Sequence, residues 1–160
     1  MSYQIARPPE SATALLFSDY LRSLWDALNP PAKRGAPRVR SREMAGLTDA
    51  EFFKVYHQRF ESLLERPRAI KLALVSSEPG EENWVGGWLL GEPGEDSLRI
   101  HWVQVKGPFR RRGFATALVD EALRQAGDPA HIVATHSHPR WVDKMQQLGI
   151  RREPLGRIET

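Results

Sequence analysis

The sequence contains no cysteine among its 160 residues. This absence excludes disulfide bonds, thiolate metal sites and a cysteine nucleophile, and it suits the reducing cytoplasm, where we expect the protein to reside. Long apolar runs are also missing, since none approaches the roughly 20 residues that a membrane-spanning helix needs. The opening segment MSYQIARPPE lacks the apolar core of a secretory signal peptide. We therefore expect no association with a membrane.

A large excess of charge of either sign is absent as well. The chain has 23 Lys and Arg against 20 Asp and Glu, a formal net charge of +3. This balance favours anionic ligands, but charge alone does not indicate nucleic-acid binding, because most charged surfaces are simply solvated. No internal repeat, low-complexity tract or domain boundary is evident. We expect one domain spanning residues 1–160, long enough to bury a core.

The most informative stretch runs from Leu98 to Gly127, with the sequence LRIHWVQVKGPFRRRGFATALVDEALRQAG. Its first part has the composition of a central strand. Strict alternation would place Arg99, His101, Val103 and Val105 on one face and Leu98, Ile100, Trp102 and Gln104 on the other. The last part carries an apolar stripe at helical spacing, and Gly127 is expected to cap the end of that helix.

The turn between this strand and this helix is crowded with positive charge. Lys106, Arg110, Arg111 and Arg112 place four cations within seven residues, and the helix opens at Gly113. The first N–H groups of a helix lack partners inside it, and the helix dipole favours anions there. The turn therefore predicts a phosphate-binding site. The alternative is a basic turn that binds nothing specific.

The remaining elements follow from periodicity, turn residues and capping signals. Strands are expected at 3–6, 70–75, 84–91 and 131–136, and helices are expected after Ser11, after Thr48, from Gly113 and at 141–148. Thr48 and Glu51 match a capping box. The three strands from 70 to 105 would form an antiparallel meander, and 131–136 would lie parallel to 98–105. The order predicts a mixed α/β fold with a mixed sheet. The long connection 30–47 is either a solvated loop or one that grips substrate.

This element order, together with Arg110-Arg111-Arg112-Gly113-Phe114-Ala115 after the fourth strand, resembles the GNAT superfamily of acyl-CoA-dependent N-acetyltransferases. The phosphate motif of that family is Gln/Arg-x-x-Gly-x-Gly/Ala. Val105 and Phe109 match its upstream pattern, and Leu148-Gly149-Ile150 matches the end of its last helix. The segments FSDYLRSLW and HWVQVKGPFRRRGFA are also similar to a branch of the superfamily common in bacteriophage genomes.

The resemblance implies an α/β (α+β) sheet that is mostly antiparallel, with helices on both faces and the fourth and fifth strands splayed apart. It also implies acetyl-CoA as co-substrate. Main-chain N–H groups from about Arg111 to Ala115 would hold the pyrophosphate, the strand would pair with the pantetheine arm, and an N–H near Val103 or Gln104 would stabilise the oxyanion. The implied cofactor-binding residues are Val103, Val105, Arg110, Arg111, Arg112, Gly113, Phe114, Ala115 and Thr116.

The groups that handle protons are less defined by the sequence. Some family members carry a histidine at the position of His101, so this residue is either a base or a hydrogen-bonded core histidine. Many members have a tyrosine at the position of Met145, which cannot donate a proton to the leaving thiolate. His136, or its neighbours Ser137 and His138, could replace it, as could water; otherwise catalysis is slow or absent. His131, His136 and His138 lack a carboxylate or thiolate companion, so we expect no metal.

Three functions are therefore compared. The first is N-acetyl transfer from acetyl-CoA to a primary amine, on a small molecule or a macromolecule, by direct attack on the thioester. The second is modification of an amino group on a nucleic-acid base, suggested by the arginine-rich segment 33–42. The third is an inactive module that binds coenzyme A or nucleic acid, suggested by Met145. The sequence leaves open whether the protein is a monomer or a homodimer.

Overall fold

The computed structural model describes residues 2–28, 46–81, 84–135, 146–147 and 149–152. Its centre is a six-stranded sheet in which the strands follow their order in the sequence. The strands are β1 (Tyr3–Ala6), β2 (Ile70–Ser76), β3 (Val85–Gly94), β4 (Ser97–Val105), β5 (His131–Ala134) and β6 (Ile150–Arg152). β1 to β4 pair antiparallel, whereas β5 and β6 join in parallel. The predicted mixed, mostly antiparallel sheet is confirmed.

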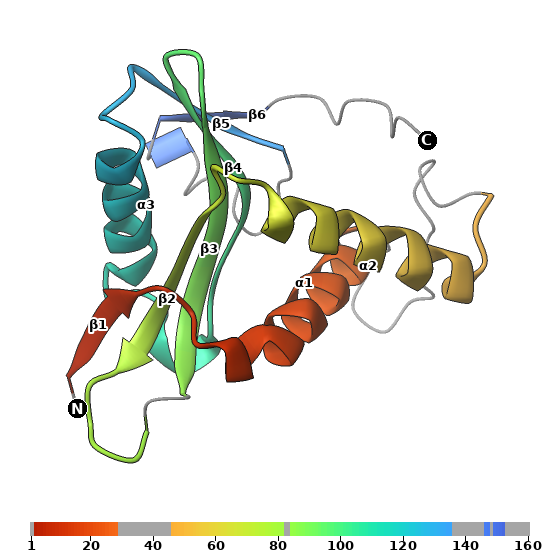
Figure 1. The fold of residues 1–160 in the computed structure, drawn as a ribbon, viewed down its shortest axis with the longest axis horizontal. Coiled ribbons are helices and arrows are strands. Elements are labelled where there is room, and N and C mark those ends of the chain that lie inside the picture. The colour runs from red at the N-terminus through yellow and green to blue at the C-terminus, as the bar shows by residue number, and fades with distance from the viewer. Residues whose placement is uncertain (1, 29–45, 82–83, 136–145, 148, 153–160) are drawn as a thin grey trace.

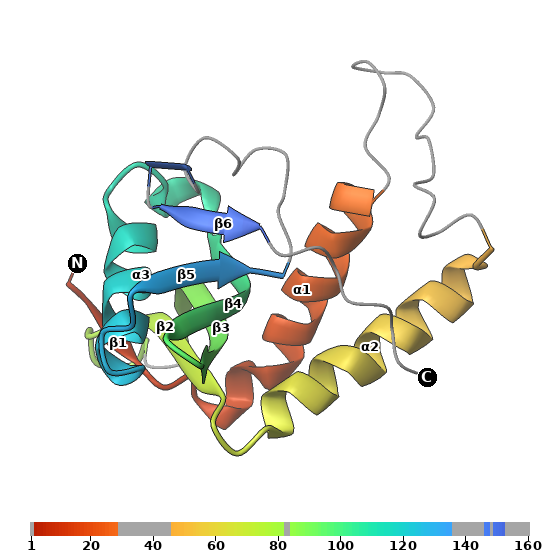
Figure 2. The same ribbon diagram turned by 90° about the horizontal axis from the view of Figure 1, so that it is seen from above.

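Helices cover both faces of this sheet (Figures 1 and 2). α1 (Thr13–Leu28) and α2 (Asp49–Glu65) lie on one face, and α3 (Phe114–Gln125) lies on the other. A short 3₁₀ turn at Glu10–Ala12 precedes α1, so Ser11 lies inside that turn and does not begin the helix as expected. The helix expected at 141–148 falls almost wholly outside the described residues.

The two helix ends flagged by the sequence have the expected geometry. Thr48 and Glu51 form the capping box of α2. At the end of α3, Gly127 has a φ of 83°, and the N–H groups of Gly127 and Asp128 donate to the carbonyl oxygens of Arg124 and Leu123. These paired bonds satisfy carbonyl groups that the helix itself leaves free.

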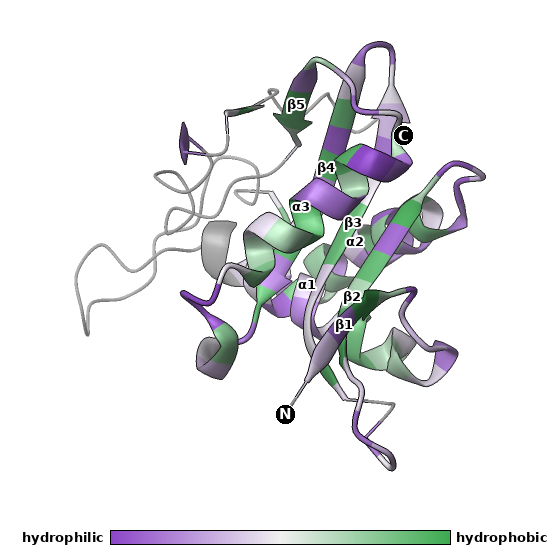
Figure 3. Cartoon of the chain, turned by 90° about the vertical axis from the view of Figure 1, so that its left-hand side faces the viewer, coloured by the Kyte–Doolittle hydropathy of each residue, from purple (hydrophilic) through white to green (hydrophobic). Residues whose placement is uncertain are grey.

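Two apolar clusters sandwich the sheet. The cluster under α1 and α2 is rich in aromatic side chains, among them Tyr20, Phe52, Phe60, Trp88 and Trp102. The cluster under α3 is mainly aliphatic and includes Leu98, Ile100, Leu118, Val119 and Ala122. In Figure 3, hydrophilic and hydrophobic residues alternate along α3, as expected for a helix with one face on a core.

A β-bulge in β4 overturns the predicted alternation of that strand. Leu90 pairs with Trp102, whereas the next residue, Gly91, pairs with Ile100, so His101 is an extra residue in β4. The α3 face receives Leu98, Ile100, Val103 and Val105, and the α1–α2 face receives Trp102. The prediction that Ile100 and Trp102 share a face is therefore wrong, because one extra residue reverses the faces of all that follow.

Candidate active site

The turn before α3 has a backbone that side chains disfavour. Gly113, the N-cap residue, has φ 78° and ψ 4°, in the left-handed region that glycine adopts at little cost. Arg111 also has a positive φ, of 63°. A non-glycine residue there costs roughly 1 kcal/mol or more, so the surrounding structure must hold this conformation in place. Such strain is typical of binding sites.

The first main-chain N–H groups of α3 have no described partner. The N–H of Arg110 donates to Gly107 at 3.2 Å, and that of Ala117 donates to Gly113 at 2.9 Å. For the N–H groups between them, from Arg111 to Thr116, the described part of the chain provides no backbone acceptor. No side chain caps this helix, and its first turn has no acidic residue. The end is therefore open to an external anion.

Anchoring contacts fix the turn while its cations stay exposed. Phe109 is buried and packs edge-on against Tyr3 and Trp84, with ring centroids 5.2 and 4.7 Å away. The Nε of Arg110 donates to the carbonyl oxygen of Val105 at 3.0 Å and so ties the turn to the end of β4. The three arginines of the turn, Arg110, Arg111 and Arg112, are exposed. Their charge adds to the field at the open helix end.

β4 separates from β5 halfway along its length. Their pairing runs from Ser97 to Ile100, and the N–H of Thr135 adds a last bond to the oxygen of Ile100 at 3.0 Å. The second half of β4 pairs only with β3 among the described residues. This free edge is where the resemblance predicts a splay and a place for the pantetheine arm.

Strand geometry decides which main-chain groups face the free edge. The N–H of Lys106 donates to Gly86 on β3 at 2.8 Å. Because successive residues of a strand point to opposite edges, Val105 and Val103 present their main-chain groups to the free edge, and Gln104 presents its own to β3. Of the two oxyanion donors left open by the sequence, the geometry favours Val103.

The side chain of Gln104 instead connects β4 to α1. Its Oε1 accepts hydrogen bonds from Ser23 Oγ at 3.1 Å and from Trp102 Nε1 at 3.3 Å. Gln104 therefore lies on the face covered by α1, beside the free half of β4. No local sequence pattern points to Ser23, because contact between a helix and a strand 81 positions away depends on the fold.

His101 is buried, and both of its ring nitrogens are engaged. Nε2 lies 3.0 Å from Glu92 Oε1, and Nδ1 lies 3.3 Å from Thr135 Oγ1. Burial lowers the pKa of His101, against the opposing effect of Glu92. Burial acts to raise the pKa of Glu92, but the hydrogen bond and charge of His101, with help from Arg66, leave it lowered. These contacts are those of a hydrogen-bonded core histidine, one of the two alternatives above.

The other sequence-predicted groups lie outside the described residues. They are His136, Ser137, His138, Met145 and the arginine-rich segment 33–42. In the described ranges, no three His, Cys, Asp or Glu side chains are grouped so as to hold a metal ion. None of the helices in those ranges is both long and apolar enough to span a bilayer.

Sequence reasoning also missed an unusual polar pair on the α1–α2 face. The atoms Asp19 Oδ2 and Trp88 Nε1 are buried, and neither has a hydrogen-bond partner in the described structure. Asp19 lies on α1 one turn before Ser23, and Trp88 lies on β3 opposite Gln104. Only the fold brings these residues together.

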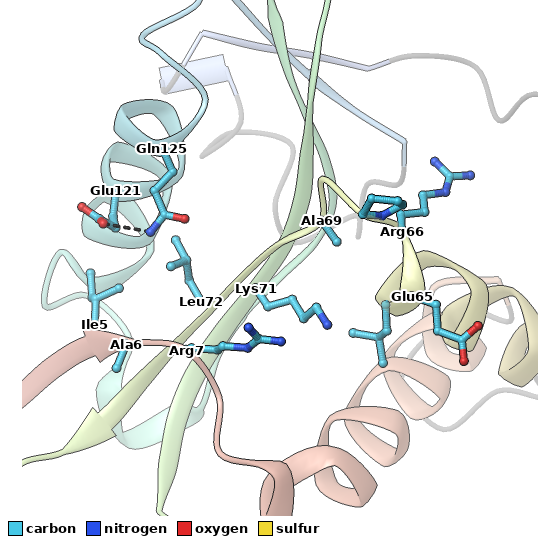
Figure 4. A pocket seen from close by; sticks show the side chains of 12 residues that line it. Ile5, Ala6, Arg7, Glu65, Arg66, Ala69, Lys71, Leu72, Glu121 and Gln125 are labelled. Carbon is cyan, nitrogen blue, oxygen red and sulfur yellow. Dashed lines mark hydrogen bonds between the residues drawn. The ribbon is translucent and has the colours of Figure 1, made fainter.

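A cleft of about 460 Å³ lies between the end of β1, β2, the end of α2 and the C-terminal half of α3 (Figure 4). Arg7 after β1 and Lys71 on β2 extend into it, and Glu121 and Gln125 of α3, hydrogen-bonded at 3.0 Å, line its far side. α3 thus contributes its C-terminal half, where the dipole disfavours anions. The cleft has cations but lacks the open helix start.

Comparisons with solved structures identify the fold. The structure matches that of a protein from Pyrococcus furiosus assigned as an acetyl transferase, with a TM-score of 0.66 and 15% sequence identity over 99% of both chains. A protein from Clostridium acetobutylicum, assigned as an acetyltransferase and solved with acetyl-CoA, matches with a TM-score of 0.60 and 14% identity, over 99% of this chain and 94% of that one. AAC(6')-Iy, in complex with the bisubstrate analogue CoA-S-monomethyl-acetylneamine, matches with a TM-score of 0.54 and 15% identity, over 100% and 97%.

These similarities define the class of fold. No protein-family model matches the sequence, and no curated protein matches it significantly. The chain nevertheless has the GNAT fold of the acetyltransferases that it resembles in structure. The resemblance predicted from the residues around Gly113 is confirmed at the level of the fold.

Proposed function

We propose that this protein is an acetyltransferase of the GNAT superfamily, which transfers the acetyl group of acetyl-CoA to a primary amine. The observation that carries this proposal is the open N-terminus of α3, next to the free edge of β4. Coenzyme A has a diphosphate, which an open helix start can bind, and next to it an amide-bearing arm, which a free strand edge can pair with. We extend the proposal to residues 1–160 as one domain and place the protein in the cytoplasm.

The described residues fit the parts of coenzyme A. The unpartnered N–H groups from Arg111 to Thr116 would bind the pyrophosphate, and the exposed arginines would neutralise its charge. Main-chain groups of Val103 and Val105 would pair with the amides of the pantetheine arm, as an added strand does. Similarity to structures solved with acetyl-CoA and with an analogue of coenzyme A supports this assignment.

The chemistry then needs two further things from the chain. Acetyl-CoA supplies a thioester whose carbonyl carbon is open to attack by a neutral amine. The N–H of Val103, directed at the free edge, would hydrogen-bond the carbonyl oxygen as negative charge develops on it. His136 and Ser137, which follow Thr135 in the sequence, remain our candidates for donating a proton to the leaving thiolate. His101, hydrogen-bonded to Thr135, would hold that residue in place.

A titration of the purified protein with acetyl-CoA tests the proposal. We expect binding in the micromolar range, and we expect Gly113→Val to weaken it at least about tenfold, because valine disfavours the left-handed conformation that shapes the turn. Gly127→Val is the matched control: Gly127, with φ 83°, lies at the other end of α3. Gly127→Val should lower the free energy of unfolding about as much as Gly113→Val does, and it should bind acetyl-CoA as tightly as the wild type.

Activity is measured separately, as release of free thiol with a panel of amines. Release with any amine would exclude the inactive module, and a lack of binding by the wild-type protein would overturn the proposal as a whole. Transfer to an amino group of a nucleobase, with DNA binding that weakens steeply as salt is added, would favour the second alternative instead.

A further inference from the structure

The polar pair of Asp19 and Trp88 stands out because native proteins satisfy nearly all buried polar atoms. Asp19 Oδ2 accepts no hydrogen bond, and Trp88 Nε1, in a side chain only 2% exposed, donates none among the described residues. The indole N–H lies close enough to lower the pKa of Asp19, yet outside hydrogen-bond geometry. The indole thus lies beside the carboxylate without donating a hydrogen bond to it.

The other side of this carboxylate is accessible. Asp19 is half-buried as a residue, and Oδ1 accepts no hydrogen bond from a described group and is not among the fully buried unpaired atoms, so part of it remains accessible. The nearest charged groups are Lys106, after β4, and Arg22, on the same helix, and both lower the pKa of Asp19. Neither forms an ion pair with it in the described structure. Among the described residues this carboxylate has no ion-pair partner, so it is suited to bind an external cation.

The position of Asp19 relates it to the proposed reaction. Ser23, one turn along α1, is hydrogen-bonded to Gln104, and Trp88 is the strand partner of Gln104 on β3. Gln104 is next to Val103, whose N–H faces the free edge of β4. Asp19 therefore lies on the α1 side of the half-strand along which we place the thioester, where an acceptor must approach.

We propose that Asp19 binds the acceptor as an ammonium ion, so that the substrates are aliphatic primary amines, which are cationic at neutral pH. Aromatic amines and the amino groups of nucleobases are neutral there and gain no charge–charge attraction from a carboxylate. The proposal rests on the proposed function, since it names the acceptor class of that same site. Asp19 acts in it as a binding group, and the bound ammonium loses one proton to solvent before its neutral nitrogen attacks the thioester.

Two isomeric amines test the charge directly. Phenethylamine is cationic at neutral pH and 4-ethylaniline is neutral, although their compositions are identical. Each is titrated into the protein saturated with coenzyme A, for the wild type, for Asp19→Asn and for the control Glu61→Gln, which removes an exposed charge on α2. We expect Asp19→Asn to weaken phenethylamine binding at least about tenfold, to change 4-ethylaniline binding less than about twofold, and to leave coenzyme A binding unchanged.

A pH series separates binding from a structural role. Burial raises the pKa of Asp19, against the effects of Lys106 and Arg22. Phenethylamine binding to the wild type should fall as the pH drops through that pKa, because the carboxylate gains a proton, and it should not do so in Asp19→Asn. A variant that melts earlier but keeps its affinity and pH profile would assign Asp19 a structural role and overturn the inference.

The remaining outcomes distinguish the two proposals. If coenzyme A does not bind, the proposed function fails. If coenzyme A binds but wild-type protein shows no affinity for phenethylamine, or prefers 4-ethylaniline, only the assignment of Asp19 fails.

Discussion

Two helices of this protein begin in opposite ways. At the start of α2, Thr48 Oγ1 accepts the N–H of Glu51 at 3.2 Å, and Glu51 Oε2 accepts the N–H of Thr48 at 2.7 Å. These hydrogen bonds lower the pKa of Glu51, so the helix supplies its own anion. At the start of α3, Gly113 provides no cap, and no acidic residue occupies the first turn.

The difference shows how a helix end that satisfies its own N–H groups differs from one that leaves them open. A helix end that serves only the fold gains stability by satisfying its own N–H groups. An end that receives a ligand must leave those groups free, and it gives up that stability until the ligand arrives. Positive charge also occurs away from such an end, because Arg7 and Lys71 line a cleft, together with Glu65 and Glu121, that has no open helix start.

The largest effect is expected from giving α3 the anion that α2 already has. Thr116 is the third residue of α3, the position that Glu51 occupies in α2. Thr116→Glu should stabilise the helix by a few tenths of a kcal/mol through the dipole, yet repel the pyrophosphate by about 2 kcal/mol or more, a roughly 30-fold loss of coenzyme A affinity. Calorimetric titration and chemical denaturation measure the two changes.

Thr116→Gln is the control for that variant, because it has nearly the same shape without the charge. It should retain most of the affinity. If Thr116→Glu bound coenzyme A as well as the wild type, the open start of α3 would not be the phosphate site.

A smaller effect on coenzyme A affinity is expected from removing positive charges at the turn before α3, and almost none from removing them at the cleft around Arg7 and Lys71. Arg111→Gln with Arg112→Gln should weaken coenzyme A binding roughly tenfold at low salt, since two exposed charges each contribute up to about 1 kcal/mol. Arg7→Gln with Lys71→Gln removes two positive charges from the cleft between β2 and α2 and should change coenzyme A affinity less than about twofold. Titrations with coenzyme A at two salt concentrations measure both losses of affinity. Equal losses from the two double variants would contradict the prediction.

The smallest effect is expected from breaking the cap of α2. Thr48→Ala should lower the free energy of unfolding by about 1 kcal/mol, because it removes the acceptor for the N–H of Glu51. Coenzyme A affinity should not change. Urea denaturation with a parallel titration checks both, and altered affinity would show that the start of α2 is not purely structural.

The features predicted correctly from the sequence are the local ones. The capping box at Thr48, the helix start at Gly113, the helix cap at Gly127 and the strand–turn–helix order depend on residues within a few positions of one another. The motif Arg110 to Ala115 belongs to this group, and for that reason the GNAT fold could be predicted from it.

The features missed are those in which distant segments meet. The extra residue His101 in β4 shows only in the pairing with β3, and it changed which side chains face α3 and which face α1. Strand patterning cannot reveal a bulge when both faces of a strand are apolar. The contacts of Asp19 with Trp88 and of Ser23 with Gln104 likewise join α1 to strands far along the chain.

The sequence by itself thus determined where an uncapped, cation-rich helix start lies, because that helix start, its glycine and its arginines are contiguous in the chain. Only the tertiary structure decided which edge of β4 is free, which residues reach it and where a carboxylate meets a buried indole. The physical reason is that backbone conformation and capping are set within a turn or two, whereas strand register and packing are set by the partner that each segment finds.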